Sequence, residues 1–353
     1  MDYKTKLDSL IETVINDRGS DLHLSVGRVP AIRVAGELIF LLKNEVLTKE
    51  DLWGIIGVIV DETKVKNFKE TLELDFSYSY KNGDVRLRGN AFFQKGDIAI
   101  AFRLVPKVRT LEELKLPQVL ADLSRKKQGF FLVVGPVGQG KSTTIASMLN
   151  LINKEEARHI VTIEDPIEYI YEPEKSMINQ REIGIDTKDF ATALKSAFRE
   201  DANVLMIGEM RNPETISAAV TAAETGHLVL STLHTNNAAQ TIDRILDSFP
   251  GYQQDQIRLQ LSTSLLGIFS QRLVPKITGG MVPAYELLLN NNAIAHLIRE
   301  KRTQEIPVAI ETGTESGMVD LNHSLMELIR SGEISVESAY EYSLNPKGLE
   351  RLM

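Results

Sequence analysis

The chain has 353 residues, with 40 lysines and arginines against 48 aspartates and glutamates, so its formal net charge is −8. This length predicts two domains or at most three, and the 43% hydrophobic fraction is ordinary for globular proteins. The absence of cysteine excludes a disulfide scaffold, a zinc ribbon and a thiol nucleophile. The acidic balance argues against a general nucleic-acid binder. The N-terminus is not a secretory signal, and no apolar run approaches the roughly 18 residues that span a bilayer.

The N-terminal part of the sequence predicts a small α+β domain over residues 1–105. Apolar residues recur at helical spacing over 7–15, and Thr48 is the expected N-cap of a second helix that continues to about Lys66. Asn82-Gly83 predicts a hairpin turn over residues 81–84, because this pair tolerates positive φ. Strands are expected at 20–25, 31–34, 37–42, 72–80, 84–92 and 98–105. Residues 106–117, with proline and charge but little pattern, are predicted to be a linker and the hinge.

Residues 118–353 predict an α/β domain. Short apolar runs at 130–134, 160–164, 204–207 and 228–232 alternate with helical patterns at 143–152, 190–198 and 213–224. This alternation is typical of parallel βαβ units with helices on both faces of the sheet. From about residue 238 the chain is expected to be mostly helical, with one further strand at 282–289.

A phosphate-binding loop follows the first of these strands. The sequence fits G-x-x-x-x-G-K-[ST] at every defined position, between an expected strand and an expected helix. Its glycines allow backbone N–H groups to surround phosphates, the lysine carries charge toward the β and γ phosphates, and the serine offers its hydroxyl to Mg²⁺. The residues expected to bind the nucleoside triphosphate are Gly135, Pro136, Val137, Gly138, Gln139, Gly140, Lys141, Ser142 and Thr143.

Three further strands are expected to end in polar side chains, at the edge where ligands bind in such sheets. Glu164 ends the first, where a carboxylate can polarise an attacking water. Glu209 follows four apolar residues, the form of a Walker B strand whose acid holds Mg²⁺. His234 follows the third strand and is a candidate contact of the γ-phosphate, while His227 precedes that strand.

Long segments of the chain resemble the type IV pilus retraction ATPases of the secretion ATPase superfamily. TIEDPIEY at 162–169 resembles their Asp box, REDANVLMIGEMRNPETI at 199–216 their Walker B stretch, and TAAETGHLVLSTLHTNNAAQTIDRI at 221–245 their His box. SDLHLSVGRVPAIRVAGE at 20–37 and VRLRGNAFFQKG at 85–96 resemble two N-terminal blocks. The extension and type II secretion ATPases usually carry a four-cysteine motif, so the lack of cysteine favours the retraction branch.

This resemblance implies a PAS-like N-terminal domain, a RecA-like P-loop ATPase domain, and ATP with Mg²⁺ as cofactors. It implies a homohexameric ring driven by domain rotation, docked on an inner-membrane pilus platform protein at the cytoplasmic face, with a second pilus ATPase as a further partner. By position, Glu164 would be the general base and Glu209 the Walker B acid, with Ser142 and Glu209 on Mg²⁺. The residues that would complete the site are the His-box pair His227 and His234, and Arg88 and Arg103 from the N-terminal domain.

Two segments depart from that family's pattern. Val137 and Gln139 stand where the family usually has threonine and serine, and the retraction signature AIRNLIRE reads AIAHLIRE at 293–300. These departures keep an accessory PilU-like retraction motor open as an alternative. A nucleic-acid translocating RecA-like motor and a partner that binds ATP without hydrolysing it are further alternatives.

Overall fold

The computed structural model describes residues 2–34, 36–81 and 85–353 and divides the chain into two units, Met1–Lys107 and Val108–Met353. The first unit contains a six-stranded sheet in the order β3-β2-β1-β6-β5-β4, with antiparallel neighbours throughout. Its elements are α1 (Tyr3–Asn16), β1 (Asp21–Ser25), β2 (Ala31–Val34), β3 (Glu37–Phe40), α2 (Lys49–Ile59), α3 (Glu62–Thr71), β4 (Glu73–Tyr80), β5 (Val85–Gln94) and β6 (Asp97–Leu104).

The apolar face of α1 packs into the hydrophobic core of the first unit. Leu7, Leu10, Ile11 and Val14 are buried in one core with residues of α2 and the sheet. The helix predicted from Thr48 to Lys66 is two helices instead, since Asp61 caps α3 after α2 ends. Of the predicted turn at residues 81–84, only Lys81 lies within the described residues.

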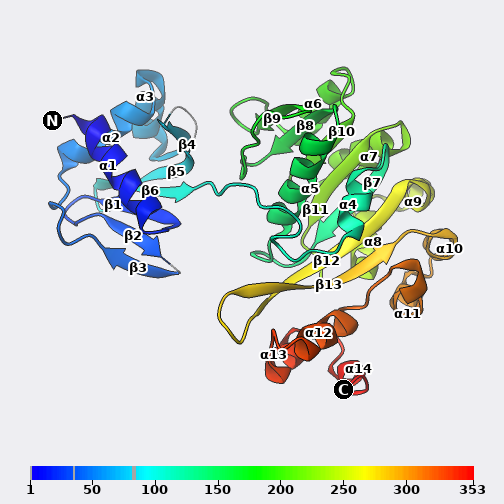
Figure 1. The fold of residues 1–353 in the computed structure, drawn as a ribbon. Coiled ribbons are helices and arrows are strands. Elements are labelled where there is room, and N and C mark those ends of the chain that lie inside the picture. Colours follow the sequence, from blue (N-terminus) through cyan, green and yellow to red (C-terminus); the bar gives the residue numbers. More distant parts are fainter. Residues whose placement is uncertain (1, 35, 82–84) are drawn as a thin grey trace. The chain divides into compact units, whose positions relative to one another are not determined.

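The second unit is a seven-stranded sheet in the order β13-β12-β7-β11-β10-β8-β9, with only the β12–β13 pair antiparallel among the described strands. Figure 1 shows helices α12 to α14 gathered beyond β13, at the opposite side from β9. Its strands are β7 (Gly129–Val134), β8 (His159–Glu164), β9 (Met177–Glu182), β10 (Val204–Ile207), β11 (Leu228–Leu233), β12 (Leu265–Pro275) and β13 (Met281–Leu289).

Helices cover both faces of this second sheet. Phe130, Leu132 and Val134 of β7 pack into a core with α6 to α11, while Phe131 and Val133 pack into another with α4 and α5. The helices are α4 (Val119–Ser124), α5 (Lys141–Glu155), α6 (Phe190–Ala197), α7 (Pro213–Glu224), α8 (Ala238–Asp247), α9 (Gly251–Ser264), α10 (Asn292–Arg299), α11 (Ile306–Thr312), α12 (Leu321–Arg330), α13 (Val336–Tyr342) and α14 (Pro346–Glu350), with short 3₁₀ turns at Thr303–Glu305 and Thr314–Ser316. None of the helices in the described ranges is long and apolar enough to cross a bilayer.

The structure differs from the sequence expectation in three places of this unit. The prediction of a single strand after residue 238 is wrong, because β12 also forms and pairs with both β7 and β13. The strand β9 was not predicted, since its sequence MINQRE is largely polar. Most of the predicted linker over 106–117 belongs to the second unit, because Leu111 and Leu116 are buried in the core beneath α4 and α5.

Candidate nucleotide site

The phosphate-binding loop joins the buried strand β7 to α5. Gly135, Gly138 and Gly140 have φ values of +146°, +78° and +79°, a region that side chains with a Cβ avoid. A Cβ on Gly135 would also lie 2.4 Å from the carbonyl oxygen of Gln271. The helix α5 begins at Lys141, directly after the last of these glycines. The loop therefore presents a helix N-terminus and a lysine together, which is the geometry that binds phosphate.

Lys141 lies inside this loop and is only 7% exposed. Its ammonium donates to the carbonyl oxygens of Gly135 and Pro136, at 2.9 and 2.8 Å, and lies 3.3 Å from Nδ1 of His234. Burial lowers the pKa of Lys141, and the nearby charges of Glu209 and Glu168 oppose that effect. The carbonyl contacts thus hold the lysine at the loop, and β11 places His234 beside it.

Glu164 ends β8 and is 6% exposed. Burial raises the pKa of its carboxyl, and hydrogen bonds from Thr162, Gln180 and the backbone of Glu168 oppose the rise. The carboxylate accepts from Thr162 Oγ1 at 2.6 Å and from Gln180 Nε2 at 3.2 Å. A fixed carboxylate with a raised pKa suits a general base, because it binds a proton more readily than an ordinary carboxylate does.

Glu209 lies just after β10 and next to His234. One carboxylate oxygen is 3.6 Å from His234 Nε2, and the other accepts from Arg211 Nε at 2.9 Å. Burial lowers the pKa of His234, the charge of Lys141 lowers it further, and Glu209 works in the opposite direction. Lys141, His234 and Glu209 therefore form one connected polar cluster at the carboxyl ends of β7, β10 and β11.

The structure does not bring every predicted residue to this cluster. His227 precedes β11, at the opposite end of the strand from His234, where its ring stacks edge-on against Phe198 and lies 3.0 Å from the carbonyl oxygen of Ala222. Seven extended residues span about 20 Å. Within one chain, His227 thus lies apart from the P-loop.

Arg88 and Arg103 belong to the first unit and are directly opposite each other on β5 and β6. Arg103 Nε donates to Asp21 at 2.8 Å while its side chain stays 69% exposed. Burial alone would raise the pKa of Asp21, but hydrogen bonds from Ser20 and Arg103 outweigh it and lower the pKa. The two arginines thus share one face of this sheet, and Asp21 anchors one of them.

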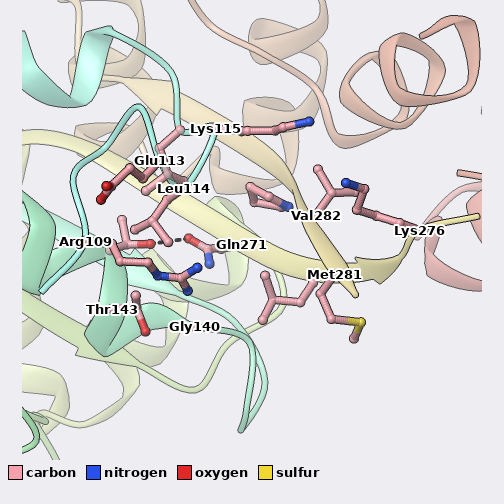
Figure 2. A pocket seen from close by; sticks show the side chains of 14 residues that line it. Arg109, Glu113, Leu114, Lys115, Gly140, Thr143, Gln271, Lys276, Met281 and Val282 are labelled. Carbon is pink, nitrogen blue, oxygen red and sulfur yellow. Dashed lines mark hydrogen bonds between the residues drawn. The ribbon is translucent and has the colours of Figure 1, made fainter. Parts of the chain in front are cut away.

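A cavity of about 430 Å³ opens beside the P-loop. Figure 2 shows the Arg109 side chain near Thr143 and Gly140, and Gln271 also lines the cavity. Its remaining lining combines Leu116 and other apolar side chains with polar ones: Glu113, Leu114, Lys115, Thr144, Leu273, Lys276, Met281, Val282 and Pro283. Sequence reasoning missed Arg109 and Gln271, because neither lies in a recognisable local motif.

The residues present fit the Mg²⁺ that accompanies a nucleoside triphosphate. Ser142 supplies a hydroxyl in the first turn of α5, and Glu209 supplies a carboxylate at the same sheet edge. Mg²⁺ is commonly held by one or two such oxygens together with waters and substrate phosphates. Within residues 2–34, 36–81 and 85–353, no group of three or more His, Asp or Glu side chains could hold a metal ion by itself.

Comparison with known proteins shows the family to which the chain belongs. The family model described as type II/IV secretion system protein matches residues 102–331. The type IV pilus retraction ATPase PilT of Pseudomonas aeruginosa is 45% identical over 93% of this chain and 95% of its own length. The type IV pilus ATPase PilU of that species is 38% identical over 99% of this chain and 91% of its own. A crystal structure of the pilus retraction motor PilT with bound ADP has a TM-score of 0.91, 46% identity and 98% coverage of both chains. The predicted family and fold class are confirmed.

Proposed function

The chain belongs to the type II/IV secretion system protein family, among the pilus retraction ATPases, and we propose that it is a motor ATPase that couples ATP hydrolysis to retraction of a type IV pilus. The observation that carries this proposal is the cluster of Lys141, His234 and Glu209 beside a P-loop, with Glu164 at the same edge of the sheet. Catalysis is then mainly positioning and charge stabilisation during in-line attack of water on the γ-phosphate.

Each polar residue takes one role in this proposal. The N–H groups of the loop 135–143 and the ammonium of Lys141 hold the phosphates, while Glu164 accepts a proton from the attacking water. Ser142 and Glu209 hold Mg²⁺, which neutralises charge on the phosphates when it is bound. His234 lies between Lys141 and Glu209, so it can register whether the γ-phosphate is present. The adjacent cavity lined by Arg109 and Gln271 has room for the rest of the nucleotide.

The assembly belongs to the same proposal. In a homohexameric ring, Arg88 and Arg103 of the first unit would reach a nucleotide. Arginine suits this role because it keeps its charge and spreads it over several phosphate oxygens. The names of the relatives place those proteins in pilus machines. We therefore propose that this chain works at the cytoplasmic face of the inner membrane, on a pilus platform protein, without nucleic acid.

One experiment tests the motor and its alternative together. The gene is expressed in two piliated hosts. The first host lacks all of its own retraction ATPases. The second host keeps its primary retraction ATPase and lacks only the accessory motor. A primary retraction motor restores surface motility in the first host, and Lys141→Ala does not. An accessory motor, which the similarity to PilU keeps as the second candidate, restores motility only in the second host. Light scattering of the purified protein with MgATP is expected to give the mass of a hexamer, and a persistent monomer would contradict the ring.

A further inference from the structure

Strand β12 continues past the end of its neighbour β7. The two strands pair from Leu265 opposite Phe130 to Ser270 opposite Val134, where β7 ends and the P-loop begins. Beyond Ser270, β12 runs on to Pro275 and remains paired with β13 on its other side. The P-loop thus lies along a stretch of β12 that has lost its parallel neighbour.

Gln271 is the first residue of this stretch and is only 3% exposed. Its Nε2 donates to the carbonyl oxygen of Gln139 at 2.7 Å, and its Oε1 accepts from Thr144 Oγ1 at 2.6 Å. Figure 2 marks the bond between Thr144 and Gln271 with a dashed line. The nitrogen and the oxygen of this buried amide are therefore both hydrogen-bonded, the nitrogen to the P-loop and the oxygen to the first turn of α5.

The Gln139 side chain makes a second contact between the P-loop and β12. Its Oε1 accepts from the backbone N–H of Leu273 at 2.6 Å, so the side chain takes the place of the missing strand partner. Serine, which the resembling family usually has at this position, is two bonds shorter than glutamine and does not reach Leu273 N from the same backbone. The loop and β12 are consequently joined in both directions, by Gln271 to Gln139 and by Gln139 to Leu273.

We propose that Gln139 and Gln271 form an amide clasp that holds the P-loop in its phosphate-binding shape, which makes both of them positioning residues for the nucleotide. The proposal rests on the nucleotide site proposed above. The clasp holds the loop between two points of close approach, since a Cβ on Gly135 or on Gly140 would lie 2.4 Å and 2.8 Å from atoms of Gln271. A loop fixed in advance binds phosphate without first having to be ordered.

Removing the amide clasp should weaken nucleotide binding and leave the rate of hydrolysis at saturating ATP nearly unchanged. Losing one neutral hydrogen bond and leaving its partner unsatisfied weakens binding by about 5–30-fold. We expect Gln139→Ser and Gln271→Leu to raise both the Kd for a fluorescent ADP analogue and the KM for ATP by that factor. The value of kcat at saturating ATP is expected to change less than about threefold, because bound phosphates restore the loop.

The decisive variant is Gln271→Glu, measured at two pH values. An ionised carboxylate cannot donate to the Gln139 carbonyl, but a protonated one can, so the weak binding at pH 8.5 should return toward the wild-type Kd at pH 6. Gln271→Leu has no such donor and should bind weakly at both pH values. Gln256→Glu, on the exposed side of α9, is the matched control and should follow the wild type.

The outcomes separate this proposal from the one on which it rests. If Lys141→Ala binds the analogue as tightly as the wild type, the nucleotide site itself is wrong. If Lys141→Ala loses binding while Gln139→Ser and Gln271→Leu keep it, the clasp is wrong. A Kd of Gln271→Glu that does not change between pH 6 and pH 8.5 also overturns it, and circular dichroism at both pH values shows whether that variant is folded.

Discussion

Glu286 on β13 makes the stability of the second unit depend on pH. Its carboxylate accepts from the backbone N–H of Ala238, the first residue of α8, at 2.7 Å. Burial raises the pKa of Glu286, the Ala238 N–H and Arg272 oppose the rise, and Asp320 adds to it, so that the pKa is raised to about 7. The folded protein therefore keeps a proton on Glu286 at pH values where the unfolded chain has released it.

The sign and the size of the effect follow from this pKa. Because the folded pKa lies above the unfolded one, the stabilisation is fully present below about pH 4.5 and is lost as pH rises to about 7. One pKa unit corresponds to about 1.4 kcal/mol, so at most about 3.5 kcal/mol is lost between pH 4.5 and pH 7. Glu286→Gln keeps an oxygen for Ala238 N–H and does not titrate. Relative to the wild type, it should gain stability progressively from pH 5 to pH 8.

Urea denaturation followed by circular dichroism at pH 5, 6, 7 and 8 measures this difference. The single tryptophan, Trp53, lies in α2 of the first unit, so its fluorescence provides an internal reference for that unit. Glu341→Gln, an exposed change on α13, is the control and should leave the wild-type pH profile unchanged. If Glu286→Gln and the wild type lose stability in parallel from pH 5 to pH 7, the buried, protonated Glu286 inferred here is wrong.

Three further predictions concern the nucleotide site. Lys141→Ala should weaken binding of a fluorescent ADP analogue by more than about 100-fold, since it removes the buried ammonium of the P-loop, and near-normal binding would exclude that role. Glu209→Gln should raise the Mg²⁺ concentration needed for half-maximal turnover by about tenfold, whereas an unchanged titration would remove Glu209 from the metal site. Gly135→Ala should destabilise the protein by about 2–3 kcal/mol, because its Cβ would lie 2.4 Å from a Gln271 oxygen. Gly138→Ala, whose Cβ meets nothing within 4 Å, should lose only about 1 kcal/mol for its positive φ, and equal losses would contradict the steric argument.

The parts of the site that could be predicted from sequence are those encoded locally. The P-loop is one contiguous segment whose glycines and lysine act within a few residues of each other, so its pattern alone predicted it. Glu164 and Glu209 could be proposed because each lies at or just after the end of a short apolar strand, and the carboxyl ends of parallel strands share one edge. The physical reason is the same in each case, since the strand that places the residue is adjacent to it in sequence.

The parts that were missed depend on pairing across long distances in the chain. Gln271 contacts Gln139 across 132 residues, and only the parallel pairing of β12 with β7 brings them together. His227 and His234 were grouped because they share one motif, yet they lie at the two opposite ends of strand β11. Leu111 and Leu116 belong to the segment predicted to be a linker, and they are buried although the surrounding residues lack a regular pattern.

Steady-state ATPase activity of wild-type protein and Glu164→Gln, with the nucleotide Kd in the same buffer, tests the central claim most directly. Glu164 is buried at the end of β8, and the amide keeps its size but cannot accept the proton of the attacking water. We expect kcat to fall about 10²–10⁴-fold with the Kd nearly unchanged, while Glu174→Gln, an exposed control, keeps wild-type turnover. Wild-type turnover in Glu164→Gln would contradict its assignment as the general base and, with it, the mechanism proposed for this motor.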